Sequence, residues 1–124
     1  MRRRAFLWVS LTFCLGLLSS LLAAPVAALT VGEILGATDR FDQKNVTLIG
    51  TAEEVRPRVS RRGNEYTTFK VVDTTGRINV FSWGIPPIKP GDRVEVRGVF
   101  QRVKRVGRYT FHNEIEASSV QRVR

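Results

Sequence analysis

Apolar and polar residues alternate along most of the chain after residue 44, and this alternation predicts five strands. The first begins at Asn45, and every second residue of 46–52 falls on one face, because side chains two positions apart point to the same side of a strand. The same period continues over residues 65–73, 77–83, 93–102 and 108–120. The apolar faces are formed by Val46, Leu48, Gly50 and Ala52; Thr67, Phe69 and Val71; Ile78 and Val80; Val94, Val96, Gly98 and Phe100; and the anchors Tyr109, Phe111 and Ile115.

Turn-forming residues separate these segments. Asp73-Thr74-Thr75-Gly76 predicts a hairpin between the second and third strands, because Asp and Gly favour the backbone angles of tight turns. Residues 84–91 contain three prolines and two glycines, so no regular element is expected there. Ahead of the strands, Thr30 followed by Glu33 has the spacing of a capping box and predicts a short helix.

A repeated spacing links the first and fourth strands, which read Val46-x-Leu48-x-Gly50 and Val94-x-Val96-x-Gly98. Glycine inside a strand usually marks a sharp bend or a close backbone approach. Five bent strands with a central hairpin and a crossover between the third and fourth are typical of a small closed barrel. We therefore predict an all-β domain, a five-stranded Greek-key barrel with a short N-terminal helix.

This pattern resembles the OB-fold, in particular the nucleic-acid-binding branch of tRNA-anticodon and single-strand-binding domains. The resemblance is carried by residues 46–50, by 66–73 with 76–80, and by 90–98, and it spans most of 31–120. It implies a binding site formed by the middle strands and by the loops joining strands one to two and four to five. A weaker resemblance, to exported bacterial OB-fold stress proteins, implies a periplasmic ligand- or protein-binding module.

The first 28 residues have the pattern of an export signal. Arg2, Arg3 and Arg4 precede an uncharged stretch, residues 5–24, which is followed by the small residues of 24–28, as signal peptidase requires. Cleavage after Ala28 leaves a domain of residues 29–124. The alternative is an uncleaved membrane anchor, because residues 5–24 are also long enough to span a bilayer. In either case we expect an exported domain, periplasmic or extracellular.

Charge and cysteine content narrow the function further. The 124 residues hold 20 Lys and Arg against 11 Asp and Glu, and without residues 1–28 the basic residues number 17 and the net charge is +6. The basic excess therefore belongs to the domain and favours a polyanionic partner. The one cysteine, Cys14, lies in the signal segment, which excludes disulfides, thiolate metal sites and a cysteine nucleophile from residues 29–124.

Basic residues concentrate in the two loops that the resemblance assigns to the site. Residues 56–64 hold four arginines and residues 102–108 hold four basic residues, enough to neutralise several phosphates. Aromatic side chains between them are candidates for stacking on bases, and Lys70 and Asn79 share the same strand phase. The expected site consists of Arg56, Arg58, Arg61, Arg62, Tyr66, Lys70, Asn79, Phe81, Trp83, Lys104, Arg105 and Arg108.

The expected partner is single-stranded DNA or RNA, and other interpretations stay open. The same charges would attract another polyanion, such as anionic lipid, a cell-wall polymer or a polysaccharide. The domain could instead bind a small ligand or a protein partner in the cell envelope. The loop arginines are alternatively a solvated surface, and Phe81 and Trp83 alternatively pack beneath the crossover or the N-terminal helix.

Catalytic residues are scarce in this sequence. His112 is the one histidine and has no second ligand at metal-binding spacing. The carboxylate pairs Glu53-Glu54 and Glu114/Glu116 lie among arginines, where ion pairing is the simpler explanation. No glycine-rich phosphate loop is present. We therefore expect a non-enzymatic protein with no metal and no cofactor.

Overall fold

The computed structural model describes residues 27–124. Its elements are α1 (Val31–Leu35), α2 (Thr38–Phe41), β1 (Asn45–Val59), β2 (Glu65–Asp73), β3 (Gly76–Trp83), β4 (Arg93–Val106) and β5 (Tyr109–Arg122). In this part of the chain neither helix has the length and apolar character needed to cross a membrane. The expected signal segment or anchor falls outside the described residues, apart from Ala27 and Ala28, which are exposed.

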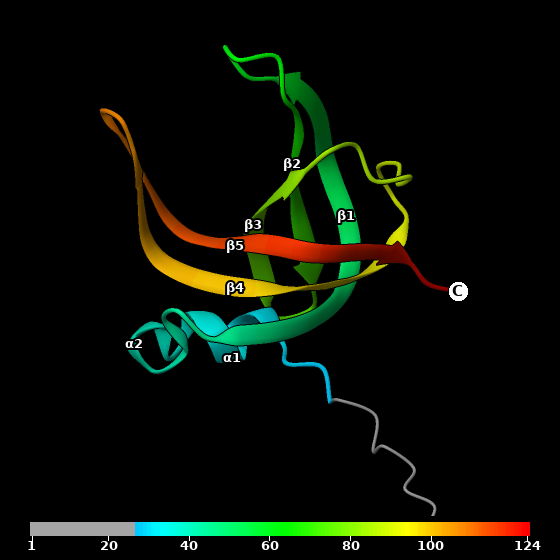
Figure 1. The fold of residues 1–124 in the computed structure, drawn as a ribbon. Helices are drawn as coiled ribbons and strands as arrows, with labels where there is room; N and C mark the ends of the chain where they lie inside the picture. Colours follow the sequence, from blue (N-terminus) through cyan, green and yellow to red (C-terminus); the bar gives the residue numbers. More distant parts are fainter. Residues whose placement is uncertain (1–26) are drawn as a thin grey trace, which may run out of the picture.

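The five strands close into a barrel in the order β1-β2-β3-β5-β4 (Figure 1). The long strand β1 pairs with β4 near its start and with β2 toward its end. β3 and β5 close the ring in parallel over residues 79–82 and 114–117, whereas the other strand pairs are antiparallel. The prediction of an all-β, five-stranded barrel is therefore confirmed.

The inner faces predicted from the alternation form the core. Leu48 of β1, Phe100 of β4 and Ile115 of β5 are among its largest fully buried side chains, and their burial supplies most of the driving force for folding. Two anchors predicted for the last strand are wrong, because Tyr109 and Phe111 are 57% and 43% exposed. The physical reason is that the first residues of β5 pair with β4 alone, beyond the closed part of the barrel.

Gly50 and Gly98, the glycines of the repeated spacing, lie where neighbouring strands approach closely. A Cβ atom at Gly98 would lie 2.7 Å from the Cα of Ala117 on β5. One at Gly50 would lie 2.7 Å from the carbonyl oxygen of Val72 on β2. Real Cβ atoms do not come so close to backbone, so the interpretation of both glycines as points of close backbone approach is confirmed.

Helix α1 packs into the barrel core through Val31 and Ile34, which are fully buried. Its start is a capping box: the backbone N–H of Glu33 donates to the Thr30 hydroxyl at 3.1 Å, and the Glu33 carboxylate accepts from the Thr30 N–H at 2.8 Å. The predicted helix is therefore confirmed. Helix α2 has no counterpart among the predicted elements, because its N-cap, Ala37, offers no side-chain hydrogen bond as a signal.

Asp73 joins α1 to the turn between β2 and β3. Its carboxylate accepts hydrogen bonds from the backbone N–H groups of Val31 (2.9 Å), Thr75 (2.7 Å) and Gly76 (3.1 Å), and from the Thr75 hydroxyl. Burial acts to raise the pKa of this carboxyl, but the hydrogen bonds from Thr75, Val31 and Gly76 together outweigh it. The pKa of Asp73 therefore lies below its usual value.

Replacing Asp73 with asparagine is expected to lower the free energy of unfolding by about 1–2 kcal/mol at neutral pH, because hydrogen bonds to a charged acceptor are stronger than those to an amide. Since the folded-state pKa is lowered, this contribution is present above the unfolded-state pKa and is lost as the pH falls through the lower folded-state pKa. Urea unfolding from neutral to acid pH measures it. A difference between wild type and Asp73→Asn that stays constant with pH would contradict a role for the charge.

Two hairpins extend beyond the closed part of the barrel, and we call them the first and second arms (Figure 1). The first arm comprises residues 56–65, from the end of β1, the turn that follows it and the first residue of β2. The second comprises residues 103–112, from β4 and β5. The loops predicted at 56–64 and 102–108 are wrong in extent, because antiparallel pairing continues through most of them and satisfies their backbone hydrogen bonds. Only 60–64 and 107–108 lie outside strands.

Candidate functional site

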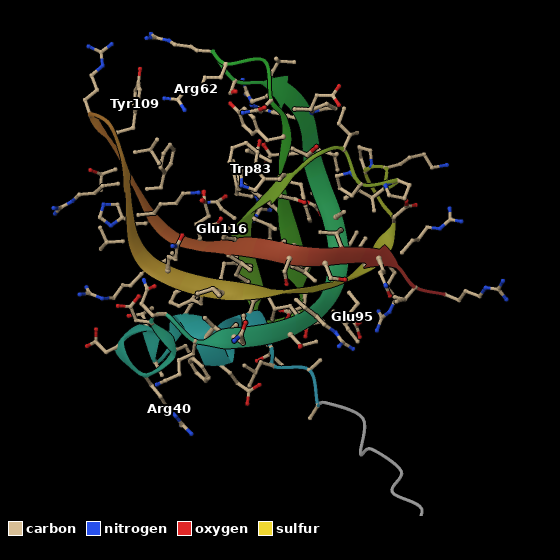
Figure 2. The ribbon with its side chains drawn as sticks, viewed as in Figure 1. Arg40, Arg62, Trp83, Glu95, Tyr109 and Glu116 are labelled. Atoms are coloured by element: carbon tan, nitrogen blue, oxygen red, sulfur yellow. The ribbon has the colours of Figure 1, made fainter. Side chains whose placement is uncertain are left out.

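A groove of about 930 Å³ lies between the two arms, over the outward-facing positions of β2, β3 and β5. Figure 2 shows Trp83 and Glu116 toward the base of the space between the arms, and Arg62 and Tyr109 near the ends of the arms. The groove is lined by Glu54, Arg56, Arg58, Ser60, Tyr66, Thr68, Phe69, Lys70, Asn79, Val80, Phe81, Trp83, Lys104, Val106, Tyr109, Phe111, Glu114 and Glu116.

Three aromatic rings form a cluster on the floor of the groove. Tyr66 and Trp83 face each other in the β2–β3 register, and Phe81 follows on the same face. The ring centres of Tyr66 and Phe81 lie 5.3 Å apart in a stacked arrangement, and Trp83 meets Phe81 edge-on at 5.0 Å. Such pairs hold rings in fixed orientations. Trp83 nevertheless remains 57% exposed, so it presents an open indole surface to the groove.

Lys104, on the second arm, contacts the floor of the groove. Its ammonium group lies 4.0 Å from the centre of the Phe81 ring and donates a hydrogen bond to Glu114 at 2.9 Å. The side chains of Lys104 and Glu114 are only 15% and 10% exposed. Phe81 is thus covered by Tyr66 and Lys104, and it supports the cluster instead of offering a free face for stacking.

A second ion pair lies on the floor next to the first arm. The Lys70 ammonium lies 3.0 Å from the Glu54 carboxylate, which is also 3.7 Å from Arg56. The hydrogen bond and charge of Lys70, with smaller contributions from Arg56 and Arg77, lower the pKa of Glu54. Glu54 has a positive φ of 52° within an irregularity of β1, and such bulges redirect side chains.

No protein family matches the chain, and no curated protein matches it in sequence. Solved structures match it in fold. The crystal structure of yeast Stn1 and Ten1 gives a TM-score of 0.62 at 10% identity, covering 85% of this chain and 66% of that chain. The OBody AM3L09 bound to hen egg-white lysozyme gives 0.50 at 18% identity, covering 68% and 85%. The second OB-fold domain of replication protein A from Methanococcus maripaludis gives 0.46 at 20% identity, covering 66% and 86%.

The chain has an OB fold. Its groove lies over the middle strands and between the β1–β2 and β4–β5 hairpins, which is the region that the resemblance implied. The shared fold shows architecture and leaves the ligand to be argued from the groove itself.

The OB domain brings most of the predicted site residues together. Phe81 and Trp83 line the groove instead of packing beneath the crossover or α1. Four of the predicted basic residues lie away from the lining, either in the turn of the first arm or toward the end of the second. The residues in the groove are Arg56, Arg58, Tyr66, Lys70, Asn79, Phe81, Trp83 and Lys104, and those outside it are Arg61, Arg62, Arg105 and Arg108.

The prediction missed the inner wall of the second arm and the acids of the floor. Tyr109 and Phe111 line the groove although their alternation was assigned to the core. Glu54, Glu114 and Glu116 also line it, so the four cations and three carboxylates of the lining leave a net charge of only +1. The sequence signal that could have placed Tyr109 and Phe111 in the groove was their alternation beside a basic turn. No local sequence pattern marked the three carboxylates as groove residues.

Residues 27–124 contain no group of three or more side chains suited to holding a metal ion. His112 is exposed on the second arm and does not line the groove. Glu53 lies 4.0 Å from Arg77, and Glu54 and Glu114 pair with lysines. Ion pairing is therefore confirmed for these three acids, although lysines supply two of the partners expected to be arginines. It is wrong for Glu116, which forms no ion pair with another residue of 27–124.

Proposed function

We propose that the OB domain binds single-stranded nucleic acid in the groove between its arms, as a non-enzymatic binding module. The observation that carries the proposal is Trp83, a 57% exposed indole held edge-on against Phe81 at the floor of a groove flanked by arginines. Tyr109 and Phe111, which are 57% and 43% exposed, line the same groove, and exposed apolar side chains gathered in one place mark a binding site. Bases of a single strand have open aromatic faces that suit such a ring.

The arms supply the complementary charge. Arg56 and Arg58 line the wall of the first arm, and Arg61 and Arg62 lie exposed in its turn. Arg105 and Arg108 are exposed on the second arm. Positive side chains along both rims with an aromatic floor between them would place phosphates outside and bases inside, which is the arrangement of a single-strand site.

Fluorescence anisotropy of the protein with a labelled single-stranded oligonucleotide, duplex DNA and heparin, across a salt series, tests the proposal. We expect tightest binding to the single strand, because duplex bases are already stacked and heparin has none. Equal affinity for all three probes, lost by physiological salt, would contradict it and would identify the arginines as a nonspecific charged surface.

Replacing both Arg61 and Arg62 with alanine is expected to reduce the slope of log K against log salt concentration by about 1.4, because each phosphate contact on a single strand contributes about 0.7 through released counterions. Neither arginine lies in an ion pair within residues 27–124, so the substitutions do not leave a carboxylate without its ion-pair partner. Arg40→Ala is the matched control, since Arg40 is exposed on α2 away from the groove (Figure 2). An equal change of slope in the control would argue against contacts at the first arm.

A second candidate function, binding of a cationic ligand or a basic protein segment in the cell envelope, is favoured by the three carboxylates of the groove. Two of them are already neutralised, Glu54 by Lys70 and Glu114 by Lys104, and the rims carry arginines. We therefore rank it below nucleic-acid binding. A labelled lysine-rich peptide added to the same anisotropy series distinguishes the two.

We also propose that the protein is exported, an assignment supported by the basic, apolar and small-residue pattern of residues 1–28. Fractionation of cells that carry the full chain with a C-terminal tag tests it. Recovery of the tag in the cytoplasm would contradict export. It would also place the domain in a compartment that contains nucleic acid.

A further inference from the structure

One carboxylate in the groove has no partner among residues 27–124. Glu54 and Glu114 are each paired with a lysine at 3.0 and 2.9 Å. Glu116, in contrast, takes part in no side-chain hydrogen bond or ion pair with any residue of 27–124, although it lines the same groove. An ionised carboxylate has four acceptor sites and no donor, so Glu116 is free to accept hydrogen bonds from whatever occupies the groove.

Glu116 borders the aromatic cluster. In the parallel β3–β5 pair it stands opposite Phe81, and Trp83 lies two residues farther along β3 on the same face. Neighbouring strands are about 4.8 Å apart and two residues span about 6.6 Å. The edge of a base stacked on Trp83 can therefore meet the Glu116 carboxylate, which Figure 2 shows below Trp83 between the arms.

The charge of Glu116 fixes which part of a strand can lie there. A phosphate next to an unpaired carboxylate would be repelled, and this repulsion is strong where the protein excludes water. The arginines of the arms attract phosphates toward the rims instead. A strand in the groove is therefore oriented with its bases toward β5, so that Glu116 meets base edges and not the backbone.

Base edges differ in what they offer to a carboxylate. Guanine presents two adjacent donors, N1–H and the 2-amino group, which match the two oxygens of a carboxylate. Cytosine and adenine present one amino group beside a ring-nitrogen acceptor, and thymine presents one N–H between two carbonyl oxygens. Hydrogen bonds to an ionised acceptor are the stronger kind, and side chains read the Watson–Crick edges of unpaired bases in this way.

We propose that Glu116 is a base-reading residue that gives the groove a preference for guanine in a single strand. This inference rests on the proposed function. It assigns a specificity to the site, whereas stacking on Trp83 and phosphate contacts on the arms bind any sequence. Glu114 cannot share the role, because its carboxylate is held by Lys104 and is only 10% exposed.

The test compares labelled thymidine oligonucleotides of about 12 nucleotides, within the site size of single-strand OB domains. One carries a single central dG, one carries deoxyinosine there, which lacks the 2-amino group, and one is all dT. With wild-type protein we expect the dG oligonucleotide to bind about tenfold more tightly than the all-dT one, with deoxyinosine between them. Glu116→Gln should reduce the dG/dT ratio to near 1, because the amide offers one acceptor oxygen where the carboxylate offers two.

Glu95→Gln is the matched control, because Glu95 lies on β4 outside the groove and pairs with Arg97 at 3.2 Å. It should keep the wild-type dG/dT ratio. Melting temperatures of both variants confirm folding, and the glutamine substitution preserves side-chain size. Equal affinity of wild type for dG and dT oligonucleotides, or a ratio unchanged in Glu116→Gln, overturns base reading and leaves the proposed function standing. Failure of wild type to bind any of the three oligonucleotides overturns the proposed function itself.

Discussion

Replacing Trp83 with alanine is expected to raise the Kd for a single-stranded oligonucleotide by about 5- to 150-fold, because stacking on an aromatic ring contributes about 1–3 kcal/mol per base. The salt slope should stay unchanged, since Trp83 carries no charge and the arginines of the arms remain. The fold should also be retained, because the side chain is 57% exposed and belongs to the floor of the groove, outside the barrel core. Anisotropy titrations at several salt concentrations measure both quantities together.

Two variants make this result specific to stacking. Ile85→Ala removes an exposed apolar side chain two residues away that does not line the groove, and it should leave the Kd unchanged. Trp83→Phe keeps a smaller ring and should give an intermediate Kd. A Trp83→Ala protein that loses affinity for heparin as much as for the oligonucleotide would contradict stacking, because heparin has no bases.

Replacing Gly98 with alanine is expected to lower the free energy of unfolding by about 3 kcal/mol or more, the upper part of the range for overpacked sites. The new methyl group would meet the Glu116 carbonyl oxygen and the Cα of Ala117, both backbone atoms of β5. Backbone within a closed barrel cannot turn aside as a flexible side chain can. β4 and β5 would have to separate, which strains the pairing that closes the ring.

Urea unfolding monitored by circular dichroism measures the effect of Gly98→Ala. The control is Arg97→Ala at the neighbouring position, where the side chain is exposed and forms only a surface pair with Glu95; this should cost at most about 1 kcal/mol. A Gly98→Ala protein as stable as the control would show that β4 and β5 can move apart, and that the glycine is not required for closure.

The regular part of the barrel is predictable because burial on one face imposes a period of two. β2 was predicted as residues 65–73, the bounds that the structure has, since its inner and outer faces alternate without interruption. β1 and β4 were predicted too short, because Pro57 and the arginines around it have the composition of a loop. What keeps those residues extended is pairing across each hairpin, and the sequence of one strand does not reveal the length of its pairing with the next.

The outward-facing residues on the floor of the groove could also be predicted from the period of two. The ion pairs that form there could not. Lys70, Asn79 and Trp83 follow from the outward phase of the middle strands. The position of Glu54 depends on a departure from the alternation, since Glu54 has a positive φ angle of 52°. Asn113, at 53°, separates Phe111, which lines the groove, from Ile115, which is buried, although the two share a phase in the sequence. Residues other than glycine rarely adopt such angles, and no local pattern announces them. Lys104 was expected to bind phosphate, but its pairing with Glu114 required knowledge of how the second arm curls over β3.

The walls of the groove are separate hairpins whose ends do not join, as Figure 1 shows. A site enclosed as a ring can be occupied only by threading a free end through it. A trough between two arms can be filled from the side. For the proposed ligand this means that an internal stretch of a long strand, or a circular strand without ends, can enter and leave as readily as a terminus, and a gap between duplex regions is as accessible as a free tail.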